Sequence, residues 1–269
     1  MSEEKTPTPE QRGVPRLLWG IIVRPRDTLG YLTERGGRTW WVPALLAVLL
    51  VVLPILVAAP VTTRQAREAV LLTREQWGEQ QGLEMSAEDQ AQMEQAMSVA
   101  ASPLITVVFP AAGGVVGLVV GWLVWAGALY LAGMALGGRS TFGQMLRVVV
   151  WTRLPYALRG LLQTVYILAS GQIIANPGLS GFVRKNQLAG EMVFTPPSPG
   201  QTLLTAFLSR VDLFLVWNLM LLVTGVTVVT HLPRRKAALA TLGVWLLLTA
   251  LSLVPAIVGG LFAQQVGGF

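Results

Sequence analysis

Five apolar runs divide the sequence, and each is long enough to cross a lipid bilayer. They cover residues 42–59, 104–136, 148–169, 203–230 and 238–262. A membrane helix needs about 20 apolar residues, because every backbone amide in the hydrocarbon core must find its hydrogen-bond partner inside the helix. Only 13% of the residues are charged, whereas soluble domains average about 25%. The sequence therefore predicts an all-α fold, a polytopic membrane bundle with five transmembrane helices.

The stretches between these runs set the expected organisation. We expect a disordered arm (1–13), followed by an interfacial amphipathic segment (14–41). A five-span membrane domain (42–262) with two outer loops (60–103 and 170–202) comes next, and a short tail (263–269) ends the chain. The first apolar run begins after some 40 polar and basic residues. That is too late for a usual signal peptide, so the first span is expected to be an uncleaved anchor.

Basic residues gather on one side of this layout. The segments expected on the N-terminal side, 1–41, 137–147 and 231–237, hold 12 Lys/Arg and 5 Asp/Glu, whereas those on the opposite side hold 5 and 8. Membrane proteins keep Lys and Arg on the cytoplasmic side. We therefore expect a multi-pass protein of the cell membrane, with a cytoplasmic N-terminus and an extracytoplasmic C-terminus. This distribution accounts for the formal charge of +6 without nucleic acid as a partner.

Three arginines, Arg16, Arg24 and Arg26, flank a short amphipathic stretch before the first run. Aliphatic residues recur at helical spacing between positions 17 and 22. Such a helix can lie in the headgroup layer, with its arginines toward the anionic headgroups at the inner face. A short helix packed under the bundle explains the same pattern equally well.

Three glycines, Gly113, Gly117 and Gly121, repeat at every fourth residue of the second run. Small residues on one helical face let another backbone approach closely, so we expect helix packing there. A glycine-lined conduit is the less favoured alternative. Beyond the bilayer itself, a membrane-protein partner or a second copy of the chain is an expected partner.

Four polar residues lie inside the third and fourth runs: Arg153, Arg159, Asp212 and Asn218. An unpaired charge at membrane depth costs about 2.5–3.5 kcal/mol on insertion scales. Asp212 therefore needs a cation, and we expect it to face the third span. Arg159 is the favoured partner, because Arg153 lies nearer the inner end and can extend to the headgroups. This polar cluster either fixes the packing of the helices or forms part of a path for a solute or proton.

Catalytic and metal-binding patterns are missing. The chain has no cysteine and one histidine, which excludes thiol catalysis, Cys-based zinc sites and disulfides. Phosphate-binding loops, metalloprotease motifs and paired intramembrane aspartates are also absent. We expect no enzyme activity, no catalytic or metal site and no cofactor.

Several patches resemble the prokaryotic Yip-domain (Ypt-interacting protein) family. They are Ile22-Val23-Arg24-Pro25-Arg26-Asp27-Thr28 before the first span, Thr141-Phe142-Gly143-Gln144 with Leu154-Pro155-Tyr156 around the third, and Val211-Asp212-Leu213-Phe214-Leu215-Val216-Trp217-Asn218 with Gly225 in the fourth. The resemblance implies five membrane helices, a cytoplasmic N-terminus and a non-enzymatic protein. Eukaryotic members bind Rab GTPases, one another and curved membranes. Their Asp-Leu-Tyr-Gly-Pro motif is absent here, so the resemblance does not extend to Rab binding.

Two functions remain in view. The leading hypothesis is a non-enzymatic integral membrane adaptor or membrane-organising protein that acts by association between helices. The alternative is a transporter or permease component that uses the intramembrane Arg/Asp cluster.

Overall fold

The computed structural model describes residues 13–34, 40–81, 87–100, 102–174, 176–183 and 199–266, and its regular structure there is entirely helical. The elements are α1 (Val14–Val23), α2 (Pro25–Glu34), α3 (Trp41–Gln81), α4 (Ala87–Ala100), the π-helical turn η1 (Leu104–Val108), α5 (Phe109–Ala135), α6 (Phe142–Thr152), α7 (Leu154–Ser170), α8 (Ser180–Val183), α9 (Pro199–Leu208), α10 (Leu213–Thr230) and α11 (Arg234–Val266). The predicted all-α class is confirmed.

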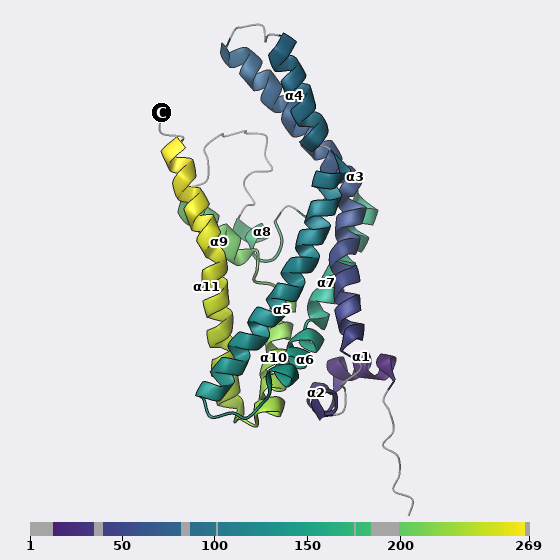
Figure 1. The fold of residues 1–269 in the computed structure, drawn as a ribbon, viewed down its shortest axis with the longest axis vertical. Coiled ribbons are helices and arrows are strands. Elements are labelled where there is room, and N and C mark those ends of the chain that lie inside the picture. The colour runs from purple at the N-terminus through teal and green to yellow at the C-terminus, as the bar shows by residue number, and fades with distance from the viewer. Residues whose placement is uncertain are drawn as a thin grey trace, which may run out of the picture.

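The helices form an elongated bundle in which α1 and the end of α11 lie at opposite ends (Figure 1). In Figure 1, α3, α5 and α11 run along the long axis, α1 and α2 lie at the lower end, and the end of α11 lies toward the upper end. The expected arm 1–13 lies outside the described residues except for Gly13, as do 184–198 of the loop 170–202 and the last three residues of the tail.

Four helices in the described part of the chain are long and apolar enough to cross a membrane: Trp41–Glu68, Leu104–Ala135, Leu213–Thr230 and Arg234–Pro255. The third expected span, 148–169, is not one helix. It is divided between α6 and α7, and α7 has 17 residues. Pro155 lies in the first turn of α7, and because proline has no amide hydrogen it cannot donate the hydrogen bond that would continue α6.

The fourth expected span, 203–230, is also divided. Helix α9 ends at Leu208 and α10 begins at Leu213, with Asp212 in extended geometry between them. We had expected Asp212 within a continuous apolar helix. A short carboxylate side chain favours the position before a helix over its interior, because it can accept a hydrogen bond from the first free amides.

The first span is longer than expected. Helix α3 does not end near Ala59 but continues to Gln81, with Pro54 and Pro60 inside it. Residues 61–77 contain neither glycine nor proline, and such a segment favours continuation of a helix. The expected outer loop 60–103 is therefore largely helical, and α3 with α4 projects beyond the rest of the bundle (Figure 1).

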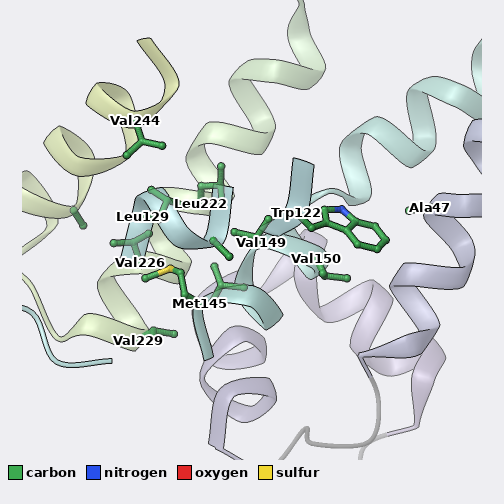
Figure 2. Packing of buried hydrophobic residues seen from close by; sticks show 13 residues of the cluster. Ala47, Trp122, Leu129, Met145, Val149, Val150, Leu222, Val226, Val229 and Val244 are labelled. Carbon is green, nitrogen blue, oxygen red and sulfur yellow. The ribbon is translucent and has the colours of Figure 1, made fainter. Parts of the chain in front are cut away.

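The main core lies where α5, α6, α10 and α11 meet. Figure 2 shows Trp122 and Leu129 of α5, Met145 of α6, and Leu222 and Val226 of α10 pointing into one cluster, each at most 6% exposed. Many other apolar side chains of α5 and α11 are exposed, among them Leu131 and Leu239, as expected for helices surrounded by lipid. The core thus holds α6 and the breaks next to it in a fixed place.

Helices α1 and α2 use one face to pack against the bundle. Leu17 and Ile21 of α1 are fully buried, in a cluster with Trp151 of α6 and Leu221 of α10. The opposite face of α1 exposes Trp19, which is 66% accessible. Of the two interpretations of this segment, packing under the bundle is seen directly, while the exposed aromatic face is available to the headgroup layer.

Candidate functional site

An ion pair joins α7 to the break between α9 and α10. Arg159, on the second turn of α7, places Nη1 3.0 Å from Oδ2 of Asp212. The two side chains are 23% and 13% exposed, so both are largely withdrawn from the surroundings. The expected pairing of Asp212 with Arg159, and not with Arg153, is present in the structure.

Asp212 has a second role in the same position. Its other oxygen, Oδ1, accepts a hydrogen bond of 2.8 Å from the amide of Leu215 and so caps α10. A capping carboxylate also lies at the positive end of the helix dipole. One carboxylate therefore starts α10 and neutralises Arg159 on α7.

Asn218 joins α10 to the other break. Its Nδ2 donates a 2.6 Å hydrogen bond to the carbonyl oxygen of Thr152, in the last turn of α6. The last carbonyls of a helix have no partner within the helix, so a buried amide from a neighbouring helix satisfies one of them. Asn218 is 1% exposed. This contact ties α10 to the end of α6, and the other polar atom of the side chain, Oδ1, is buried without a hydrogen-bond partner among the described residues.

Arg153 stands apart from these contacts. It lies between α6 and α7, and its guanidinium carbon is 5.2 Å from the ring centres of both Trp125 and Tyr156. Each such cation–π contact contributes about 0.5–2 kcal/mol. Among the described residues, no carboxylate lies within ion-pair distance of Arg153. The expected escape of its side chain toward the inner headgroups is not seen.

A cavity of about 420 Å³ opens beside these residues. Its lining comes from α5, α7, the α9–α10 connection and α11, and it includes Arg153 and Arg159. Arg210, which the sequence analysis left out of the cluster, also lines it and donates to the hydroxyl and the carbonyl of Ser252 on α11. The sequence signal that could have indicated Arg210 is its position two residues before Asp212 in the same apolar run.

The glycines expected to pack are open. A Cβ atom added at Gly113, Gly117 or Gly121 would meet nothing within 4 Å, so no other described helix packs closely at these three positions. Close packing occurs at other glycines. Gly160 of α7 lies against the carbonyl of Leu50 on α3, and Gly225 of α10 lies against Val148 of α6.

The basic N-terminal residues are placed as a surface group. All three are exposed: Arg16 lies on α1, Arg24 directly follows α1, and Arg26 lies on α2. Their contact with anionic headgroups stays a prediction. Among the described residues, no group of three His, Cys, Asp or Glu is arranged to hold a metal ion.

Comparison with known proteins gives one match. A family model described as the Yip1 domain matches residues 19–256, which includes both helix breaks and all four candidate membrane spans. Neither the curated proteins nor the solved structures that were compared gave a match.

Proposed function

The chain belongs to the Yip1 domain family, and from that premise we propose that it is a non-enzymatic adaptor or organiser of the cell membrane that acts through association between membrane helices. Its membership confirms the resemblance predicted from the motifs, and the chain is a multi-pass membrane protein. The open glycine face of α5 is the observation that carries the proposal.

This face, formed by Gly113, Gly117 and Gly121, combines two properties. The glycines repeat at four-residue spacing, and nothing in the described chain comes within 4 Å of an added Cβ. The neighbouring Gly114 faces α3, where an added Cβ would lie 2.9 Å from Val51. Helices in lipid associate through close backbone approach at small residues. The glycine face therefore offers a second helix, from a partner or another copy, the same approach that Gly114 offers α3.

The transport alternative has less support from the contacts of its polar residues. Three of its four polar residues are engaged inside the bundle: Arg159 is paired with Asp212, and Asn218 binds the backbone of α6. These contacts support a role in joining α7, α10 and α6.

The glycine face can be tested by crosslinking in intact membranes. The chain has no cysteine, so a single Val120→Cys change beside the face gives a clean disulfide assay. We expect Val120→Cys to crosslink, and an added Gly117→Leu to lower the yield about ten-fold because its side chain blocks close approach. The fold should be unaffected, since the leucine enters open space.

Two matched controls accompany this test. Leu123→Cys places the thiol about 120° away from the centre of the glycine face on the same helix. Gly127→Leu changes another open glycine of α5, about 80° from that centre. Equal crosslinking from Val120→Cys and Leu123→Cys, or equal loss with Gly117→Leu and Gly127→Leu, would contradict association through this face.

The orientation is a separate prediction. The distribution of basic residues supports a cytoplasmic N-terminus, and α1 and the end of α11 lie at opposite ends of the bundle (Figure 1). We expect an alkaline phosphatase fused after residue 269 to be active and a fluorescent protein fused there to stay dark. The reverse pattern would place the C-terminus in the cytoplasm.

A further inference from the structure

The cavity beside the helix breaks carries more positive charge than its own residues neutralise. Three arginines line it, Arg153, Arg159 and Arg210. Only Arg159 has a carboxylate partner among the described residues. Arg210 is held by the neutral Ser252, and Arg153 only by aromatic rings. The surroundings therefore favour an anion.

The cavity also has the polar groups that such an anion needs. Hydroxyl groups of Ser209, Thr249 and Ser252 lie in its lining with the arginines. Arginine presents a planar set of donors that matches the oxygens of phosphate, and these charge-assisted hydrogen bonds are strong. The hydroxyls of Ser209 and Ser252 donate to the carbonyls of Ala206 and Thr249, so the hydroxyl of Thr249 is the one that can donate to a remaining oxygen. This combination is typical of a phosphate site.

The rest of the lining is apolar. It includes Trp125 of α5, Leu215 of α10, and Trp245 and Leu248 of α11, beside the ring of Tyr156. Figure 1 shows α5 and α11 close together at their lower ends and diverging upward. A volume of about 420 Å³ accepts more than a bare phosphate ion. A ligand that joins a phosphate to apolar chains fits both parts of the lining.

The cavity lies within reach of the bilayer's own phosphates. Helix α10 has 18 residues between Asp212 and His231, a length of about 27 Å. Ser252 likewise follows Arg234, at the basic end of α11, by eighteen residues, again about 27 Å. Since the hydrocarbon core is about 30 Å thick, both helices place the end of the cavity at Arg210 and Ser252 toward the leaflet opposite their basic ends, whereas Trp245, about 16 Å from Arg234, lies near mid-depth.

We propose that this cavity binds the phosphate group of an anionic phospholipid from the surrounding bilayer, with Arg153 and Arg210 as its cationic ligands. The shared chemistry with free phosphate is the set of arginine and hydroxyl donors. The apolar lining and the position toward a leaflet favour the lipid. The proposal is independent of the glycine face on α5.

The test uses the purified full chain, freed of lipid in a neutral detergent. It is titrated separately with phosphatidylglycerol, phosphatidylcholine and inorganic phosphate, while bound ligand is counted by native mass spectrometry and stability is followed by thermal unfolding. We expect phosphatidylglycerol to bind as one tightly held lipid and to raise the unfolding temperature. R153Q should weaken that binding about ten-fold or more, because it removes a charge that the chain itself does not neutralise.

The controls separate the possible outcomes. Arg235 is exposed at the basic end, so R235Q should leave tight binding unchanged. R153Q breaks no ion pair among the described residues, so it should fold. If R153Q does not fold, R210Q tests the same site, because the side chain of Arg210 is exposed. Protection by inorganic phosphate that equals that of the lipid would overturn the lipid assignment. Unchanged phosphatidylglycerol binding in R153Q, or in R210Q where R153Q fails to fold, would overturn the site.

Discussion

Asp212→Ala is expected to lower the free energy of unfolding by about 3 kcal/mol. The change leaves the Arg159 guanidinium, 23% exposed, without its counter-charge, and it removes the cap on the Leu215 amide. Removing one member of a buried pair costs about 3–5 kcal/mol and losing a cap about 0.5–2 kcal/mol, while partial exposure reduces the first figure. Thermal or denaturant unfolding in detergent measures the loss.

Two further variants separate the charge from the cap. Asp212→Asn keeps a side-chain oxygen for Leu215 and loses the charge, so we expect a smaller loss than in Asp212→Ala. The exchange of Arg159→Asp with Asp212→Arg restores opposite charges but leaves α10 uncapped, because arginine has no acceptor. The exchange should therefore recover the stability contributed by the ion pair but not the stability contributed by the cap. Wild-type stability in Asp212→Asn would show that the pair contributes nothing.

Gly160→Ala is expected to have the second large effect. The new methyl group would press against the carbonyl oxygen of Leu50, closer than real Cβ atoms come to other atoms. Because the obstacle is backbone, α3 and α7 must move apart. We expect the free energy of unfolding to fall by about 1–3 kcal/mol, the usual cost of overpacking. The unfolding transition of the purified chain reports it.

Gly121→Ala is the matched control, because the same substitution on α5 meets open space. Replacing a helical glycine by alanine in such a place favours the helix by about 0.5–1 kcal/mol. Gly121→Ala should therefore be neutral or slightly stabilising. Equal stability of the two variants would mean that α3 and α7 do not approach closely at Gly160.

The sequence was sufficient for the class of fold and for one contact of the site. Apolar length alone indicates membrane helices, and Asp212 is the only carboxylate in the apolar runs, so its need for a cation pointed to Arg159. The resemblance seen in the family motifs is confirmed by the match of the family model to residues 19–256. Each of these signals depends on composition or local pattern, which the sequence contains in full.

The rest depended on how the helices meet. Pro155 marked a bend, but the sequence did not show that α6 and α7 would become separate helices. Likewise, the spacing of Gly113 and Gly117 is visible in the sequence, whereas the closeness of Leu50 to Gly160 is set by the packing of α3 against α7. A glycine pattern shows where close approach is possible, and only the neighbouring helix decides where it happens.

Helix α3 sets how far the molecule reaches from the bilayer. Its 41 residues give a length of about 61 Å, twice the hydrocarbon thickness of about 30 Å. Helix α4 runs back from this far end to η1, and the tip stands several Debye lengths from the lipid headgroups at a physiological Debye length of about 8 Å. Charge on the lipid surface is therefore screened at the tip, and a protein that binds there would be indifferent to lipid composition, whereas contacts made along α5 would depend on it.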